Sequence, residues 1–375
     1  MVIVGKTYSR YINTLNILAI SAFALLLYDP FFIVDVGFQL SYLAVFGLIV
    51  FQPVVYKLFE FKNKWIDKLW ALCSVSLAAQ VITFPLSAFY FHQFPVYFLV
   101  SNLFIIVPSA VIMYSGILFL LLPQIPVLSK SIAYILEKSI IIMNKTLAVI
   151  EHIPYASVGK IWLNPYEYLL LYVIIISLFY FLYDKKPWLL KVSIVCTLLF
   201  CISWSIKRIR LSQSDSIAWL DLKKHKGIVF KNGNDAVVLS DIKPTDKIYQ
   251  YSIQPYLDSC QVENVVLLDP NQDIKTSWLI KKYNLIQFLN KKIFIYNGEL
   301  ENNLFSKKLK TDYIYFTGNR EPGVNEINSN FDYQMLILDG TNSDNLISRL
   351  CQLNKNKSVA YIVLKRNKSF ISVSN

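Results

Sequence analysis

Long runs of apolar residues fill the first half of the chain, and short alternating runs follow in the second half. A helix needs roughly 20 mostly apolar residues to cross the hydrocarbon core of a membrane. Runs of about that length occupy residues 11–28, 33–51, 69–91, 96–122, 165–183 and 187–206, and a weaker candidate occupies 130–152. Pro85 and Pro108 lie inside two runs and predict a kink or a break there. The pattern predicts a polytopic α-helical membrane domain over residues 1–210.

Residues 211–375 contain short runs rich in β-branched and aromatic residues, separated by turn residues. Such runs are typical of strands. We predict strands at 217–222, 227–231, 236–240, 262–268, 292–297, 313–317, 334–339 and 360–364, and helices at 248–259 and 344–353. Asn232-Gly233-Asn234 predicts a hairpin turn. We therefore expect a soluble α/β domain after the membrane domain.

Composition supports this division. Only 17% of the 375 residues are charged, against about a quarter in a typical soluble protein. Residues 1–210 hold 16 basic and 8 acidic residues, whereas residues 211–375 hold 21 and 17. This excludes a single soluble domain, a disordered chain and a small disulfide-stapled secreted protein. The five cysteines show no C-x-x-C spacing, which argues against a cysteine-based metal site.

Charge also predicts part of the topology. The loop 53–68 carries four lysines, so the positive-inside rule places it in the cytoplasm and the turn 92–95 outside. The final run has three basic residues at each end, so charge does not fix the side of the soluble domain. That side depends on whether 130–152 crosses the membrane.

Polar residues form a stripe in the run 69–91. Ser76, Gln80, Thr83 and Ser87 follow one another at spacings of four, three and four, which places them on one helical face. A polar face in a membrane helix lines an aqueous path or packs against another helix through small residues. The sequence leaves both interpretations open.

A second stripe runs along 130–152, where polar pairs recur every seven residues. Three lysines lie on it: Lys130, Lys138 and Lys145. One interpretation is an amphipathic helix in the membrane interface. The other is a spanning helix that turns a basic stripe towards a path for a polyanion.

Single polar residues in the other runs also have two possible interpretations, lining a path or a local structural role. Arg10 and Asn13 share a face at the start of the first run, where Arg10 lines a path or is a snorkelling anchor. Asn102 lies before Pro108, where it lines a path or satisfies freed backbone groups. Gln39 and Ser41 are polar residues in an otherwise apolar helix.

The segment from Asp29 to Gly47 contains Gly37-Phe38-Gln39-Leu40-Ser41 after a proline turn and ends before Gln52-Pro53. It resembles the signature of the ComEC-type competence family, which takes up DNA in natural transformation. Arg10 and Asn13 upstream also match. Downstream matches are Thr83-Phe84-Pro85-Leu86, Phe91-His92 and Ser101-Asn102-Leu103, so that the resemblance covers roughly residues 8–210.

The resemblance implies a channel component for single-stranded DNA in the bacterial inner membrane. Its partners would be single-stranded DNA, the lipid bilayer, other DNA-uptake proteins and further copies of the chain. The candidate path residues are Arg10, Asn13, Gly37, Gln39, Ser41, Ser76, Gln80, Thr83, Asn102, Lys130, Lys138 and Lys145. The family favours an extracytoplasmic soluble domain. Full-length members usually begin with further helices and an OB-like domain, so we expect an N-terminally truncated member.

Many family members carry a metallo-β-lactamase-like domain in the position of residues 211–375. Ile217–Asp221 and Gly227–Phe230 resemble its opening hairpin, but Thr317-Gly318-Asn319 stands where His-His-Gly would fall. The only histidine of residues 211–375 is His225. A two-metal hydrolase needs an H-x-H-x-D-H cluster with further ligands. We therefore expect a degenerate domain with no metal, no cofactor and no catalytic residue. The rival functions are a nuclease acting on the incoming DNA and a transporter of another solute.

Two polar segments in the soluble domain have alternative interpretations. Asp339-Gly340-Thr341-Asn342 resembles a turn motif of shorter family members, or is a strand-end turn capped by Asp339. The basic loop around His225 contacts phosphate or is a solvated turn.

Overall fold

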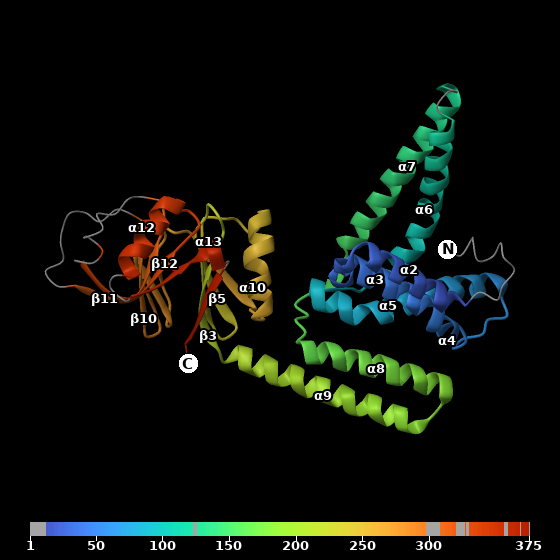
Figure 1. The fold of residues 1–375 in the computed structure, drawn as a ribbon, viewed down its shortest axis with the longest axis horizontal. Helices are drawn as coiled ribbons and strands as arrows, with labels where there is room; N and C mark the ends of the chain where they lie inside the picture. The colour runs from blue at the N-terminus through green and yellow to red at the C-terminus, as the bar shows by residue number, and fades with distance from the viewer. Residues whose placement is uncertain are drawn as a thin grey trace. The chain divides into compact units, whose positions relative to one another are not determined.

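Helices form the N-terminal unit and strands dominate the C-terminal unit of the computed structural model (Figure 1). The units are Met1–Trp204 and Ser205–Asn375. The structure describes residues 13–122, 126–297, 308–319, 327, 330–355, 359–367 and 369–374. The predicted architecture, a helical membrane domain followed by a soluble α/β domain, is confirmed.

Every predicted apolar run forms a helix. The helices are α2 (Thr14–Tyr28), α3 (Val36–Val50), α4 (Gln52–Tyr56), α5 (Lys64–Phe91), α6 (Phe98–Leu121), α7 (Pro126–Glu151), α8 (Pro165–Asp184) and α9 (Pro187–Ser212). By length and composition, the spanning candidates among the described helices are α5, α6, α8 and α9, while α2 and α3 are apolar but shorter.

The alternative of a break at Pro85 or Pro108 is wrong, because α5 and α6 continue through these residues. A proline removes a single helical hydrogen bond, and the bonds on either side maintain the helix.

Helix α5 is the centre of the N-terminal unit. Gly47 of α3 lies against it so closely that a Cβ atom there would stand 2.8 Å from the carbonyl oxygen of Ala78. On the same side, Phe51 stacks on Phe179 of α8 with ring centroids 4.2 Å apart. Membrane helices gain little by exchanging lipid for protein, so small residues that let backbones approach decide where they pack.

The segment between α2 and α3 is a hydrogen-bonded turn around the short 3-10 helix η1 (Pro30–Val34). The Asp29 carboxylate accepts from the Phe31 amide at 2.9 Å, and that of Asp35 accepts from Phe38 at 2.7 Å. The Gln39 amide nitrogen donates to the carbonyl oxygen of Ile33 at 2.7 Å. These bonds satisfy polar groups at helix ends.

Two sheets form the core of the C-terminal unit. The five-stranded sheet has the order β14-β3-β4-β5-β6, with β3 (Asp215–Leu220), β4 (Gly227–Asn232), β5 (Asp235–Ser240), β6 (Asn264–Leu268) and β14 (Ser369–Ser374). The seven-stranded sheet has the order β13-β12-β11-β10-β9-β8-β7, with β7 (Ile274–Lys275), β8 (Leu279–Lys282), β9 (Leu285–Phe288), β10 (Lys291–Tyr296), β11 (Leu309–Phe316), β12 (Phe331–Leu338) and β13 (Ala360–Val363). Strands β10 to β13 run parallel.

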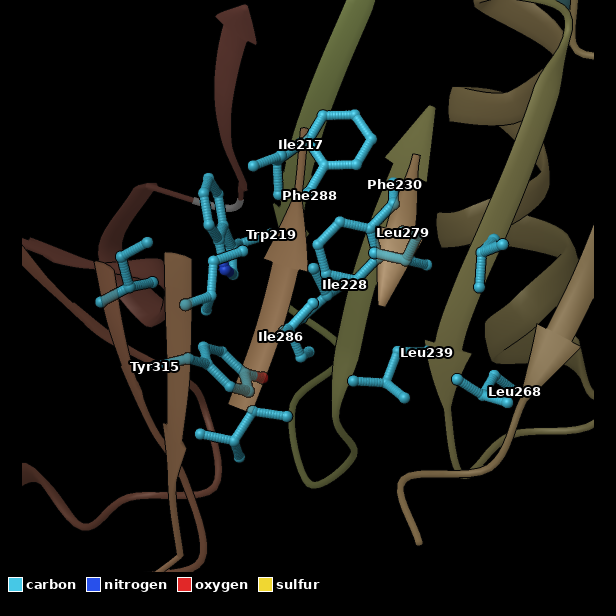
Figure 2. Close-up of a cluster of buried hydrophobic side chains, with 14 of the residues drawn as sticks. Ile217, Trp219, Ile228, Phe230, Leu239, Leu268, Leu279, Ile286, Phe288 and Tyr315 are labelled. Carbon is cyan, nitrogen blue, oxygen red and sulfur yellow. The ribbon is translucent and has the colours of Figure 1, made fainter. Parts of the chain in front are cut away.

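Large apolar side chains fill the space between the two sheets, as Figure 2 shows for Trp219, Phe230, Phe288 and Tyr315. Helix α12 (Asp344–Lys355) covers the outer face of the seven-stranded sheet. The π-helix η2 (Tyr249–Ile253) and α10 (Gln254–Ser259) cover the outer face of the other sheet. The domain is therefore a four-layer α/β/β/α sandwich (Figure 1). All strands and both helices predicted here are confirmed.

We expect the Gly47→Ala variant to be destabilised by about 1–3 kcal/mol, the usual result of overpacking, because the new methyl group would meet Ala78 backbone. Gly116 of α6 is the control, since a Cβ there meets no atom within 4 Å. Gly116→Ala should be neutral or stabilising by up to about 1 kcal/mol through helix propensity. Thermal unfolding of the full chain in detergent measures both. Equal melting temperatures for the two variants would contradict the packing argument.

Candidate functional site

A polar hollow of about 480 Å³ lies where α5, α6 and α7 meet a short ribbon of β1 (Phe94–Pro95) and β2 (Ser157–Val158). Its lining residues are Ser87, Phe91, Gln93, Pro95, Tyr97, Ser101, Leu147, Ile150, Glu151, Ala156 and Ser157. Hydroxyl, amide and carboxyl groups from separate elements thus face one space. Such a concave site with convergent polar groups is the usual form of a binding site.

The end of α5 shapes this hollow. His92 ends the helix in a left-handed conformation, with φ at 57°. Its ring stacks on Trp162 with centroids 3.5 Å apart, and its carbonyl oxygen accepts from the Ile161 amide at 3.0 Å. The Val96 amide donates to Ala156 at 2.9 Å. These contacts hold the segment after α7 against the segment after α5.

The predicted stripe on α5 has mixed surroundings. Ser87 lines the hollow. Ser76 is only 8% exposed, and Gln80 is half-buried. The Thr83 hydroxyl donates to the Ala79 carbonyl within its own helix at 2.8 Å. The stripe therefore faces protein at its middle and reaches open space at Ser87.

The residues near the start of the chain lie elsewhere. Arg10 falls outside the described residues. Asn13 caps α2, where its side chain accepts from the Leu15 amide at 3.0 Å. Gly37 lies in the first turn of α3. Ser41 lines a groove of about 370 Å³ between α2 and α3, beside the hydrogen-bonded pair Ser21 and Tyr42.

The remaining candidates lie on α6 and α7, which pack together as an antiparallel hairpin (Figure 1). Asn102 is half-buried on α6, next to Ser101 of the hollow. Lys130, Lys138 and Lys145 are all exposed along α7. The Lys138 ammonium lies 5.2 Å from the centre of the Tyr134 ring. The structure brings Ser87 and Ser101 to one hollow and leaves the lysine stripe apart from it.

Sequence reasoning missed other polar groups that the fold brings together. Gln93 lies in the predicted turn 92–95 and Tyr97 follows it. Their convergence with Glu151 depends on the β1–β2 ribbon, which is too short to predict. Glu167 was missed as well. It is fully buried and accepts from the Ser203 hydroxyl of α9 at 2.7 Å. A carboxylate at the start of an apolar run was a signal that could have identified it.

A second cluster lies at the carboxyl ends of β11 and β12 in the C-terminal unit. Both oxygens of the buried Asp339 carboxylate accept hydrogen bonds. The Tyr315 hydroxyl donates to Oδ2 at 3.0 Å. The amide and hydroxyl of Thr341 and the side-chain amide of Asn342 donate to Oδ1. These four donors thus hold the Asp339 carboxylate at the ends of these two strands.

This cluster is linked to the two loops beside it. The Gly318 amide donates to the Thr341 hydroxyl at 2.8 Å, joining the segment after β11. Gly340 approaches the β3–β4 loop so closely that a Cβ would stand 2.6 Å from the Lys223 carbonyl oxygen. In that loop, His225 Nδ1 lies 2.9 Å from an Asp241 oxygen. Asp339 thus caps a strand-end turn, as one of the two sequence interpretations held.

The residues that the structure describes contain no group of three or more His, Cys, Asp or Glu side chains placed to hold a metal ion. Asp339 is engaged by donors and His225 by Asp241. Neither forms part of a ligand set.

The chain matches two protein-family models. One, described as "Competence protein", covers residues 1–185, and the other, described as "ComEC C-terminal domain", covers residues 217–374. No curated protein and no solved structure matches the chain. The two models cover both units.

Burial raises the pKa of Asp339 above its ordinary value of 3.8, and the hydrogen bonds from Thr317, Thr341 and Tyr315 oppose this only in part. Because the folded-state pKa exceeds the unfolded one, the stability that this carboxyl contributes is lost as pH rises through the folded pKa. The free energy of local opening of residues 336–343, measured by hydrogen exchange, should therefore fall as pH rises above 3.8, the ordinary pKa of this carboxyl.

The Asp339→Asn variant has no group to titrate at this position, so its free energy of local opening should lose this dependence on pH. Asp332→Asn, at an exposed position on the same strand, is the control and should keep it. The same slope in Asp339→Asn as in the wild type would show that another group titrates.

Proposed function

The chain belongs to the ComEC-type competence family, and from this premise we propose that it forms part of the path by which single-stranded DNA crosses the inner membrane. The family membership and the apolar helices make it a multi-pass membrane protein of DNA uptake. The role as a channel for single-stranded DNA goes beyond family membership and is our proposal. The observation that carries it is the polar hollow of Ser87 and Ser101, since a polyanion needs a hydrated path through the bilayer.

The β1–β2 ribbon supports a proposal for the topology of the path. Phe94 pairs with Val158 and Pro95 with Ser157, so the ends of α5 and α7 lie on one side of the membrane. If the turn 92–95 is extracytoplasmic, α7 has brought the chain back to that side. Helix α8 then crosses to the cytoplasmic side, and helix α9 crosses back to the outer side. This favours an extracytoplasmic soluble domain, as the family resemblance implied.

The lysine stripe of α7 crosses the membrane in this topology. By length and composition α7 is not among the four spanning candidates of the described helices, because its charged residues interrupt the apolar stretch. In the proposed topology it nevertheless returns to the outer side and carries Lys130, Lys138 and Lys145 through the membrane region. Lysines in a bilayer are costly unless they face water or anions. We therefore assign the stripe to the DNA path. Gln39, Ser41, Gln80 and Asn102 remain further candidates for lining it.

We propose that other polypeptide completes the wall of the path. Only 6% of an 18-residue apolar stretch of α6 is buried within the chain. Further copies of the chain or other DNA-uptake proteins are the proposed partners of this surface.

We propose that the soluble domain is not an enzyme. Its support is the chemistry at the edge where related hydrolases hold metal. Thr317 and Asn319 offer neutral groups there, and donors occupy both oxygens of Asp339. A nuclease of that class needs ligands free to bind metal and generate hydroxide.

We expect Ser101→Leu to reduce DNA uptake by about tenfold, which corresponds to a barrier about 1.4 kcal/mol higher. The larger apolar side chain would fill the hollow. Ser115→Leu is the matched control on the same helix, because both hydroxyls donate to the carbonyl four residues before them. Transformation frequency at equal membrane levels measures the effect. Equal frequencies for the two variants would refute a DNA path through the hollow.

Replacing Lys130, Lys138 and Lys145 together by glutamine should weaken DNA uptake severalfold and reduce its salt dependence, because fewer cations would contact phosphate. The triple arginine variant keeps the charge and should keep most uptake. Radiolabelled DNA entry into cells is the measurement. Unchanged uptake in the glutamine variant would instead favour an interfacial α7.

The purified full chain should bind less than stoichiometric zinc or manganese and should not cleave single-stranded DNA. Metal analysis and a cleavage assay with added zinc, manganese or magnesium test this. Stoichiometric metal together with cleavage would establish the nuclease alternative. Intact DNA uptake after deletion of the protein, with altered accumulation of a small solute, would establish the transporter alternative.

A further inference from the structure

The end of α9 is fixed to the five-stranded sheet by a buried lysine. Lys231 of β4 is 1% exposed. Its ammonium donates to the carbonyl oxygens of Leu211 at 2.6 Å and Ser214 at 2.7 Å, and to the Ser214 hydroxyl at 3.0 Å. These carbonyls belong to the end of α9 and the residues just after it. A cation there satisfies the otherwise unpaired groups of a helix C-terminus.

Strand β6 begins beside the same helix end. The Arg208 guanidinium lies 3.8 Å from a carboxylate oxygen of Glu263, the residue before β6. Helix α9 is one of the spanning candidates, and its apolar stretch gives way to Lys207, Arg208 and Arg210. Basic residues at the end of a spanning helix lie at headgroup depth. The ion pair is too exposed to add much stability, but it places the start of β6 at that depth.

Strand β6 exposes apolar side chains without interruption. Val265 is 40% exposed, Val266 49% and Leu267 36%. The strand is the last of its sheet, and only β5 pairs with it among the described strands. Soluble proteins protect such edges with lysine, proline or bulges. The segment from Asn264 to Leu268 contains none of the protecting residues.

The acidic groups around β6 are engaged. Glu263 pairs with Arg208. The Asp235 carboxylate accepts from the Asn264 side chain at 2.8 Å. At about 3.3 Å per residue, Val265 and Val266 lie within roughly 10 Å of Glu263 along the strand. Apolar residues this close to headgroup depth can reach the boundary between headgroups and acyl chains.

We propose that β6 is a membrane-docking edge, whose side chains of Val265 and Val266 contact the lipid surface next to the end of α9. The bilayer is the occupant because the exposed strand begins beside the basic end of α9, which is a spanning candidate, and Glu263 pairs with Arg208 there. The soluble domain is thereby held at two points, Lys231 on the helix end and β6 on the lipid. This inference does not depend on the DNA path.

The test uses the full chain with its five native cysteines replaced, reconstituted in vesicles of phosphatidylethanolamine and phosphatidylglycerol. A nitroxide is attached in separate variants to Val265→Cys, Val266→Cys or Ile280→Cys. Ile280 of β8 is the control, because it is 40% exposed on the other sheet. Electron paramagnetic resonance then compares collisions with oxygen, which concentrates in lipid, and with a water-soluble nickel chelate.

We expect the ratio of oxygen to nickel accessibility to be severalfold higher at positions 265 and 266 than at 280. Transfer from vesicles to detergent-free nanodiscs of the same lipids should preserve the difference. Equal ratios at all three positions would overturn the proposal. So would spin–spin broadening at 266, because it would mean that β6 pairs with β6 of a second copy instead of lipid.

Discussion

The close approach of α3 to α5 at Gly47 is the contact on which the membrane unit depends. In lipid, apolar side chains alone give helices little reason to associate, so backbone approach at small residues selects the partner. Gly47 meets the Ala78 backbone, and Phe51 extends the same contact to α8. The same helix carries Ser87 near its end to the hollow with α6 and α7.

The family signature takes on a structural meaning from this contact. Asp29 and Asp35 cap successive helices, and Gln39 closes the turn between them by binding the Ile33 carbonyl. The turn fixes the direction in which α3 leaves it and so delivers Gly47 to α5. A polar residue in an apolar helix thus has a local hydrogen-bonding role here, whereas Ser41, two residues on, faces a groove. The two residues that looked equivalent in the sequence have different surroundings.

The sequence predicted most elements because their periodicity is local. The apolar runs became helices, and the β-rich runs became β3 to β6 and β10 to β13. Strands β7 to β9 were missed because they are short and carry Lys275, Lys281 and Lys282. Strand β14 was missed because it pairs with β3, far away in sequence.

Of the residues that line the site, only Ser87 was predicted from the sequence. Its neighbours Gln93, Ser101 and Glu151 come from other elements, and no helical spacing relates them. Lys231 was missed because a lysine is expected at the surface, yet here it caps a helix from within the sheet.

The central claim is that the hollow at Ser87 and Ser101 is wet and that DNA occupies it. The most direct measurement is the reaction of a membrane-impermeant thiol reagent, added outside competent cells, with Ser101→Cys and with Ser115→Cys in a background lacking the native cysteines. The account predicts that the cysteine at 101 reacts quickly, that the one at 115 does not, and that incoming DNA slows the reaction at 101. An unreactive cysteine at 101, or a rate that DNA leaves unchanged, would contradict it.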